Sequence, residues 1–460
     1  MAKTISVTRM YSRFKILLLF IPVAAVASFP AKSGDPTLRP PIRDQDIPVM
    51  VEADGQLRIE IADEQLLLPD AQRPFMFYLK SGAILLQGHL LEPSPPGPRM
   101  HFPKTLISVI SRDNAQSWAP LSLRWNENEL SLEGGLVQRS DGELIALDTY
   151  IVPGDQPDQG VGQCYYSDDD WHTVSGPKDA HFALQNASYP SKDDRGHPHQ
   201  AQRLHRRIVA DSDGNLLTTF YGWMKEDVTP STYEPQMIKS RVMLARSIDD
   251  GIHWQFVSTV AVDPEVGTEG FGEPVLVRVS RGSQKGRLIC LMRTGRELYQ
   301  TFSDDEGMTW RKAQPLIFAG IDINRTELWV DLFRKLTGNN GPLDENNPDE
   351  LRGAYVDPDL IELRSGLLVA AFGVRITQKA FGTEPRYPWN GNYIAFSRDH
   401  GETWSNVLRT TSGVLTSHYM AIEESPEDDK IFVAYDLGGW APGMRHGIHG
   451  RFIKITKVTE

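Results

Sequence analysis

The stretch Phe271–Trp310 reads FGEPVLVRVSRGSQKGRLICLMRTGRELYQTFSDDEGMTW and contains one complete unit of a pattern that recurs along the chain. Two apolar runs, 275–279 and 287–292, flank a Gly- and Ser-rich turn, which predicts a β-hairpin. A third extended run, 297–302, leads into a turn of the form S-x-D-x-G-x-T-W. In that turn Asp305 can accept hydrogen bonds from nearby amides, and Gly307 can adopt a positive φ angle. The stretch therefore predicts a four-stranded antiparallel sheet.

The same unit recurs as a strand, a polar turn with glycine, a second strand, a linker and a turn built on Ser-x-Asp. The hairpin turns contain Gly82, Gly142, Gly214, Gly286 and Gly366, and Asp428-Asp429 takes this place in a sixth hairpin, 420–435. We refer to the Ser-x-Asp turns as Asp-turns, and they begin at Ser111, Ser167 (a degenerate copy), Ser247, Ser303 and Ser397. The sixth hairpin has no Asp-turn, and the plain strand after it, 451–458, is expected to close the fold.

Six antiparallel units in one chain predict an all-β fold, a six-bladed β-propeller built from four-stranded blades. One four-stranded sheet cannot bury both of its faces alone, so repeated sheets must pack against one another. A β-sandwich with chance repeats is the competing interpretation, and four good Asp-turns in register argue against it. Two long polar excursions, 155–200 and 324–352, interrupt the repeat, and loops of this kind build binding surfaces on a rigid scaffold.

The first 27 residues have the composition of a signal peptide. A basic leader precedes an apolar core, 16–24, and Ala25-Val26-Ala27 forms a small-residue cleavage pattern. The core is too short to span a bilayer comfortably, although a retained membrane anchor is the competing interpretation. Residues 28–46 form a Pro-rich lead-in, and residues 47–460 are expected to form the propeller. We therefore expect an exported protein, periplasmic or extracellular, without stable membrane insertion.

Charge and cysteine content narrow the possible partners. The formal net charge of −12 and the pI near 5.5 argue against nucleic acid as a partner. Cys164 and Cys290 are too few for a disulfide scaffold, and the sequence leaves open whether they pair. A metal or substrate loop is conceivable at Gly196-His197-Pro198-His199, with His205 nearby, but such polar loops are mostly solvated. We expect neither a metal nor another cofactor.

The Asp-turns and six hairpins make residues 47–458 resemble the sialidase superfamily, whose members are six-bladed propellers with Asp-box turns. The resemblance implies several functional positions. Arg73 stands where these enzymes carry an arginine at the first inner strand, although the surrounding motif is degraded. Glu273 and Arg293 match a Glu before the fourth hairpin and an Arg about one hairpin later. Tyr419, within Ser417–Ile422, matches the tyrosine nucleophile that opens the last hairpin.

Further positions follow less directly from the same resemblance. The third arginine of these enzymes has two candidates here, Arg386 and Arg375. Asp357, in Asp357-Pro358-Asp359, opens the fifth hairpin at the place that Glu273 has in its own unit, and so either lines the same central site or forms a turn. His418 precedes the candidate nucleophile. Because strand entries from different blades converge at a propeller axis, Arg73, Glu273, Arg293 and Tyr419 are expected to meet there.

The chemistry of an acidic sugar explains these residue types. A sialic acid carries a carboxylate on its anomeric carbon, which would repel a carboxylate nucleophile. A tyrosine activated by a neighbouring glutamate avoids that repulsion. Arginines bind the substrate carboxylate through paired, charge-assisted hydrogen bonds.

One expected residue is missing. Sialidases have an aspartic acid/base after the first hairpin, but no Asp occurs between Asp70 and Asp113. The loop 91–104 offers only Glu92 and His101 as replacements, and His101 is preferred because it lies nearer the following strand.

Three functions remain open on the sequence alone. The first is a secreted retaining exo-glycosidase that removes a terminal sialic acid or related acidic sugar from a glycan. The second is a polysaccharide lyase acting on uronic-acid glycans, with His101 or His418 and Tyr419 moving the protons. The third is a glycan-binding propeller without catalytic activity. The partner expected in each case is an acidic glycan or glycoconjugate.

Overall fold

The computed structural model describes residues 48–90, 105–122, 124–125, 128–192, 196, 198–325, 330–331, 334, 352–376, 387, 389–412, 417–438 and 446–458. The chain divides into two units, residues 1–40 and 41–460, and every described residue belongs to the second. The expected signal peptide and lead-in lie outside the described residues. In the described part, no helix has the length and apolar composition that crossing a membrane requires.

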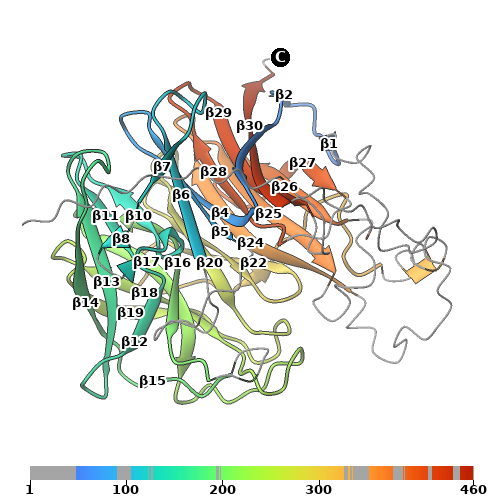
Figure 1. Ribbon diagram of the computed structural model, residues 1–460. Coiled ribbons are helices and arrows are strands. Elements are labelled where there is room, and N and C mark those ends of the chain that lie inside the picture. Colours follow the sequence, from blue (N-terminus) through green and yellow to red (C-terminus); the bar gives the residue numbers. More distant parts are fainter. Residues whose placement is uncertain are drawn as a thin grey trace, which may run out of the picture. The chain divides into compact units, whose positions relative to one another are not determined.

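The described residues form an all-β structure of antiparallel meanders (Figure 1). The first meander has the strand order β4 (Ala71–Tyr78), β5 (Ile84–Leu90), β6 (Thr105–Ser111) and β7 (Ala119–Leu121). The fourth is built in the same way from β20 (Gly272–Arg278), β21 (Leu288–Arg293), β22 (Leu298–Ser303) and β23 (Gln314–Pro315). The hairpin and third strand expected between Phe271 and Trp310 are therefore present, and the fourth strand is short.

A ten-stranded sheet contains the second and third meanders. The second consists of β10 (Leu136–Gln138), β11 (Leu144–Leu147), β12 (Tyr150–Pro153), β13 (Gln159–Ser167) and β14 (Ser175–Ala183). The third consists of β15 (Ala187–Ser188), β16 (Gln202–Ala210), β17 (Leu216–Met224), β18 (Arg241–Ser247) and β19 (His253–Ala261). The parallel pairs β10–β16 and β14–β19 help to join the two meanders. A two-stranded ribbon, β8 (Arg124–Trp125) and β9 (Asn128–Glu129), and a 3-10 helix, η3 (Leu132–Gly134), precede β10.

The fifth and sixth meanders include strands from the N-terminal part of the unit. The fifth is β24 (Gly353–Glu362), β25 (Leu368–Ile376), β26 (Gly391–Ser397) and β27 (Ser405–Ser412), extended by β1 (Val49–Met50). The sixth is β28 (Met420–Glu424), β29 (Lys430–Gly438) and β30 (His446–Lys457), completed by β2 (Leu57–Ile61) and β3 (Gln65–Pro69). Both β2 and β3 pair with β30, so a segment before the first meander completes the last sheet.

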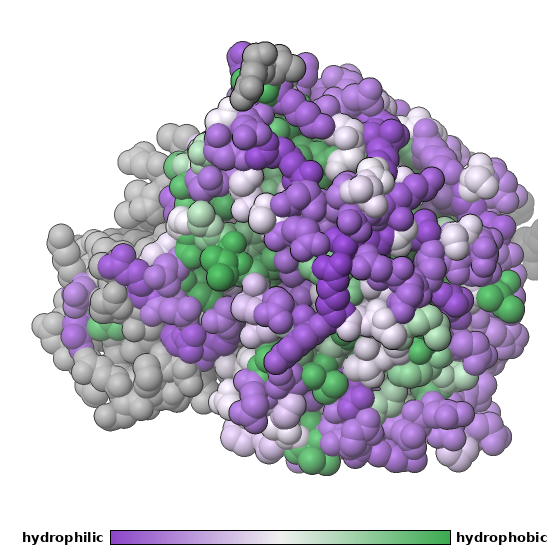
Figure 2. Space-filling view, turned by 180° about the vertical axis from the view of Figure 1, so that it is seen from behind, coloured by the Kyte–Doolittle hydropathy of each residue, from purple (hydrophilic) through white to green (hydrophobic). Residues whose placement is uncertain are grey.

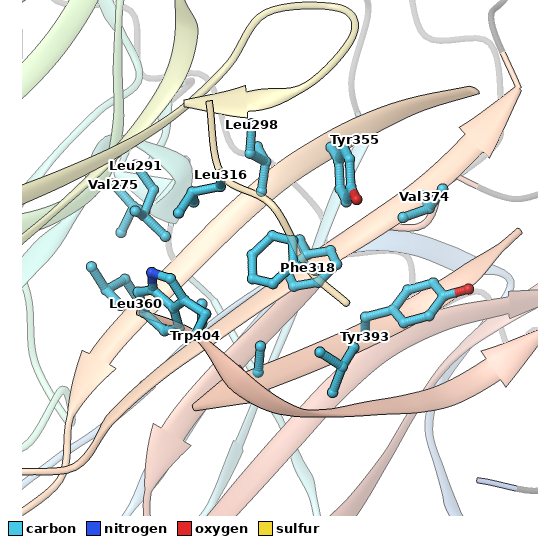
Figure 3. Packing of buried hydrophobic residues seen from close by; sticks show 14 of the residues in the cluster. Val275, Leu291, Leu298, Leu316, Phe318, Tyr355, Leu360, Val374, Tyr393 and Trp404 are labelled. Carbon is cyan, nitrogen blue, oxygen red and sulfur yellow. The ribbon is translucent and has the colours of Figure 1, made fainter. Parts of the chain in front are cut away.

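Apolar side chains pack between consecutive meanders. One cluster joins the fourth and fifth meanders, where Val275 and Leu291 lie near Phe318, Leu360 and the Trp404 indole (Figure 3). Other clusters join the first meander to the second, the second to the third, the third to the fourth, the fifth to the sixth and the sixth to the first. The face in Figure 2 is instead covered mainly by hydrophilic residues. Burial between sheets, rather than cross-links, holds the fold together, since Cys164 and Cys290 are both buried and free.

The Asp-turns share one hydrogen-bonding pattern. In the Ser303 turn, Ser303 Oγ accepts from the Gly307 amide at 2.8 Å, and Asp305 Oδ1 accepts from the Thr309 amide at 2.9 Å. The turns at Ser111, Ser247 and Ser397 repeat both bonds. The Ser167 turn, which looks degenerate in the sequence, also makes both bonds, with Trp171 at a φ of 66° where the turns at Ser247, Ser303 and Ser397 have glycine. The turn is therefore specified by its Ser and Asp, and its glycine is replaceable.

The first strand of several meanders carries a bulge. The register of β4–β5, β16–β17, β20–β21 and β24–β25 is interrupted near the start of the first strand. Arg73, Arg206, Glu273 and Asp357 lie in these bulges with φ angles of 56°, 69°, 42° and 44°. His418, just before β28, has a φ of 55°. A bulge redirects side chains out of the regular alternation, so equivalent positions of different meanders present charged groups.

Candidate functional site

Tyr419 and Glu273 form the centre of the candidate site. Tyr419 immediately precedes β28, and its hydroxyl donates a hydrogen bond to Glu273 Oε1. Glu273 Oε2 accepts the backbone amide of Asp357 at 3.1 Å. Tyr419 is 6 % exposed and Glu273 7 % exposed, so the pair is nearly removed from bulk water. The hydrogen bond places a carboxylate acceptor directly on the phenol.

Arg293 binds the same Glu273 carboxylate oxygen that accepts the hydrogen bond from Tyr419. Its Nη1 lies 2.7 Å from Glu273 Oε1, and its Nη2 lies 3.3 Å from Glu269 Oε2. Arg293 reaches Glu273 because Gly272 and Arg293 are cross-strand partners in the β20–β21 ladder. The spacing of one hairpin between Glu273 and Arg293 therefore has a structural cause.

The surrounding charges fix the protonation of the pair. Burial by itself would raise the pKa of Glu273, but Arg293, His205 and the Tyr419 hydrogen bond hold that pKa well below its usual range. Burial and the charge of Glu273 raise the pKa of Tyr419, against the effect of Arg73 and Arg293. At neutral pH the pair is thus a phenol and a carboxylate, a proton donor poised beside its base.

Two further arginines lie beside Tyr419. The Arg73 guanidinium is 5.3 Å from the centroid of the Tyr419 ring, and the Arg73 amide donates to Asp436 Oδ2 at 3.4 Å. Arg375, on β25, donates to the Ser417 carbonyl at 3.1 Å. Burial, together with the repulsion of Arg293, lowers the pKa of Arg375 to about 10, which still leaves it charged at neutral pH. Three guanidinium groups therefore surround one tyrosine.

The other predicted positions are either buried next to the candidate site or lie outside the described residues. Asp357 is fully buried behind Glu273 and binds Arg206 through its carboxylate. His418 is 1 % exposed, with Nδ1 3.4 Å from Asn392 Oδ1, so it packs behind Tyr419. The remaining candidates, Arg386, His101 and Glu92, lie outside the described residues. Of the two candidates for the third arginine, Arg375 is the one that the described structure brings to the site.

The sequence did not indicate that side chains of the second and third meanders also lie beside Glu273. Arg203 of β16 forms an ion pair with Glu133 of η3, and it counts among the charges that lower the pKa of Glu273. Tyr221, on β17, packs against Gly272 beside Glu273, where a Cβ on the glycine would come within 3.4 Å of the tyrosine ring. The available signal was positional, since Glu133 and Arg203 precede the second and third hairpins as Glu273 precedes the fourth.

The sequence suggested that His205 could belong to a metal or substrate loop at residues 196–199, but the structure places it elsewhere. It lies on β16 with 0 % exposure, and its ring contacts Pro274 and Asp357. His199 instead packs edge-on against Trp223, with ring centroids 4.9 Å apart. His197 lies outside the described residues. No group of three or more potential metal ligands is found among the residues that the structure describes.

Comparisons with known proteins give the fold. No protein-family model and no curated protein matches the sequence. Among solved structures, a protein of unknown function from Dyadobacter fermentans is similar, with a TM-score of 0.56 and 15 % identity over 86 % of this chain and 99 % of the other. An α-L-arabinofuranosidase from Fusarium graminearum has a TM-score of 0.50 and 12 % identity, over 86 % of this chain and 98 % of the other. The Hadza microbial sialidase Hz136 has a TM-score of 0.49 and 15 % identity, over 85 % of this chain and 66 % of the other.

The fold is one that glycoside hydrolases use. At these identities the likeness extends to the fold and not to the reaction. The chemistry must be argued from the site itself, where a phenol, its hydrogen-bonded carboxylate and three guanidinium groups lie together. Such a site can generate a phenolate and bind an anion at the same time.

Proposed function

We propose that the protein is an exported retaining exo-glycosidase of the sialidase type, which removes a terminal sialic acid or a related acidic sugar from glycans. The observation that carries this proposal is the hydrogen bond from Tyr419 to Glu273, with Arg73, Arg293 and Arg375 around the tyrosine. An isolated buried tyrosine would need no ionised carboxylate on its hydroxyl. If the ion pair of Glu273 and Arg293 had only a structural role, it would not need two further guanidinium groups, those of Arg73 and Arg375, beside it.

The reaction would proceed in two displacements. Tyr419 gives its phenolic proton to Glu273 while its oxygen bonds to the anomeric carbon and the glycosidic C–O bond breaks. The leaving oxygen takes a proton from an acid, for which His101 remains our candidate ahead of Glu92. Water then attacks the anomeric carbon of the glycosyl-tyrosine and loses a proton to the same acid/base. The tyrosine recovers its proton from Glu273, and two inversions give net retention.

Charge favours an acidic sugar over a neutral one. Arg73 has no ion pair with any described residue, whereas Arg293 is shared between Glu273 and Glu269. A free guanidinium beside the nucleophile can bind a carboxylate through two parallel hydrogen bonds. A neutral arabinofuranoside, the kind of substrate named for the Fusarium graminearum protein, would leave this charge without a partner.

The proposed architecture is a closed ring of six blades over residues 47–460. Apolar clusters between consecutive meanders, including the one between the sixth and the first, support the closure. The bulged first strands would then line the axis, which accounts for the meeting of Arg73, Glu273 and Tyr419. The proposed export depends on residues 1–27, which would be removed.

A product assay on defined glycans tests this function. The purified protein is incubated with sialosides, uronic-acid oligosaccharides and arabinofuranosides, with Tyr419→Phe as the inactive comparison. We expect free sialic acid to be released. NMR should show that the first product has the same anomeric configuration as the substrate. Absorbance of an unsaturated uronate would identify a lyase instead. Binding without turnover of any substrate would identify a non-catalytic glycan-binding protein.

A further inference from the structure

A buried pair lies directly behind Glu273, and the proposed mechanism does not use it. His205 on β16 and Asp357 on β24 are both 0 % exposed. His205 Nδ1 lies 3.0 Å from the carbonyl oxygen of Pro274, and His205 Nε2 lies 3.3 Å from Asp357 Oδ1. Pro274 directly follows Glu273, and the Asp357 amide is the donor to Glu273 Oε2. The imidazole therefore contacts both backbone segments that hold the candidate base.

Hydrogen-bond chemistry fixes the number of protons on this pair. A carbonyl oxygen only accepts, so His205 Nδ1 carries a proton. His205 Nε2 and Asp357 Oδ1 face each other, and neither atom hydrogen-bonds any other described group. An ionised carboxylate and an unprotonated ring nitrogen are both acceptors, so their buried contact requires a second proton between them.

Two neighbours of the pair, Arg206 and Glu273, favour the histidine as the site of that second proton. Asp357 Oδ2 accepts a hydrogen bond from Arg206, which stabilises the ionised carboxylate. The imidazole also lies near the Glu273 carboxylate, whose negative charge favours a cation. Burial and the charge of Glu273 raise the pKa of Asp357, and Arg206 and His205 offset only part of that rise. The other charged groups facing Glu273 come from separate elements: Arg203 on β16, Arg293 on β21, Arg375 on β25 and Glu269 before β20.

We propose that His205 is a buried imidazolium that, paired with Asp357, fixes the position of Glu273 and keeps its carboxylate ionised. His205 is thus a positioning residue, because it touches neither Tyr419 nor a substrate and acts through Glu273. The importance of the pair rests on the proposed function, in which Glu273 is the base for Tyr419. Its protonation can be tested without any substrate.

The first experiment measures the protonation of the two His205 ring nitrogens directly. ¹⁵N NMR of histidine-labelled protein is recorded between pH 5 and pH 8, and the His205 signals are assigned by their loss in His205→Asn. Both ring nitrogens are expected to show the shifts of a protonated imidazolium throughout this range. In Asp357→Asn at pH 7, one nitrogen should change to the unprotonated form. An unprotonated Nε2 in the unaltered protein would overturn the proposal.

The second experiment reads the effect on Glu273. ¹³C NMR of glutamate-labelled protein follows the Glu273 carboxyl, assigned by its loss in Glu273→Gln. His205→Asn keeps a donor for the Pro274 carbonyl but carries no charge, so the titration midpoint of Glu273 should rise by about 1 pH unit or more. Glu423→Gln is the control, because Glu423 pairs with Arg207 in the neighbouring ionic cluster and does not touch Glu273. An unchanged Glu273 midpoint in His205→Asn would overturn the positioning role.

A kinetic measurement then separates this inference from the proposed function. If an acidic aryl glycoside is hydrolysed, the acidic limb of kcat/KM against pH should move upward in His205→Asn by the same amount as the Glu273 midpoint. The kcat at pH 8 should stay within about 3-fold of the unaltered protein, because Glu273 is ionised there in both. If no glycan is turned over, the proposed function fails while the two NMR results still decide the state of His205. Should His205→Asn not fold, His205→Gln replaces it in all three measurements.

Discussion

At the scale of single residues, Tyr419 and Glu273 can be tested separately. Tyr419→Phe removes the hydroxyl and keeps the ring under Arg73, so we expect kcat on an aryl glycoside to fall by about 10³-fold or more while the fold persists. Glu273→Gln keeps a hydrogen-bond acceptor for Tyr419 but removes the base, and a fall of roughly 10²–10⁴-fold is expected. Steady-state kinetics on one substrate give both values.

The matched control for these variants is Tyr299→Phe. Tyr299 lies on β22 and lines a separate pocket of about 520 Å³ with Trp310, at the far edge of the fourth meander. Tyr299→Phe should hydrolyse the aryl glycoside with the kcat of the unaltered protein. Full activity in Tyr419→Phe would remove the nucleophile from the mechanism and overturn the proposed function.

The arginines give a prediction about substrate charge. Arg73→Gln should raise KM for a carboxylate-bearing substrate by roughly 10- to 100-fold, because a charge-assisted hydrogen-bonded pair contributes about 1.5–3 kcal/mol. The effect on a neutral analogue should be small. Arg278→Gln is the control, since Arg278 pairs with Glu306 on the same meander as Glu273 but away from the site. Equal KM changes on charged and neutral substrates would contradict a carboxylate clamp.

The sequence indicated residues of the candidate site where a proline or a hairpin marked their positions. Glu273 precedes Pro274, and Arg293 ends the next strand, so their spacing could be read directly. His205 could not be recognised, because it sits inside the apolar-basic run of β16 and its contacts come from β20 and β24. Contacts between different meanders depend on tertiary packing, which local spacing does not encode.

At the scale of elements, the second Asp-turn provides a stability test. Asp169 accepts from the Thr173 amide and hydroxyl at 2.8 and 2.7 Å, so Asp169→Ala should lower the free energy of unfolding because both donors lose their partner in the turn. Asp168→Ala is the control, because Asp168 is exposed one residue earlier in the same turn. Chemical denaturation measures both variants. Equal stability of the two would show that the turn needs no aspartate.

The same turn shows that the pattern S-x-D-x-G-x-T-W is stricter than the structure requires. Its Gly is replaced by Trp171 and its Trp by Val174, so the sequence match is poor. The structure keeps both hydrogen bonds, and the Trp171 side chain packs into the core between the first and second meanders. Burial of the indole offsets the cost of a positive φ angle, which for a non-glycine residue is of order 1 kcal/mol.

At the scale of the whole unit, closure depends on a segment far from the last hairpin. The sequence indicates a closing strand at 451–458, and β30 covers it, but β30 lies between β29 and β2 rather than at the edge. The pairing of Leu57–Ile61 with Ile453–Lys457 joins residues about 400 positions apart. Hairpin spacing cannot predict such a partner, because any exposed strand edge offers the same backbone groups.

Glu64 ties this closing segment to the sixth meander and makes its stability depend on pH. Glu64 Oε2 lies 2.7 Å from both Arg451 Nη2 and the Tyr435 hydroxyl, and Glu64 Oε1 lies 3.1 Å from His449 Nδ1. Burial would raise the pKa of Glu64, but the hydrogen bonds from His449, Tyr435 and Arg451 lower it to about 2. A carboxyl with a lowered pKa contributes stability above its unfolded pKa and loses it as the pH falls toward the folded value.

The prediction is a pH-dependent difference between the unaltered protein and Glu64→Gln. Above about pH 5 the variant should be less stable by roughly 2–3 kcal/mol, and the difference should shrink through pH 4 and 3 and vanish near pH 2. Denaturant titrations at several pH values measure it. Glu60→Gln is the control, because the exposed pair of Glu60 and Arg58 on β2 contributes little at any pH. A constant difference between Glu64→Gln and the unaltered protein from pH 7 to pH 2 would mean that the Glu64 carboxylate does not hold the closing segment by its charge.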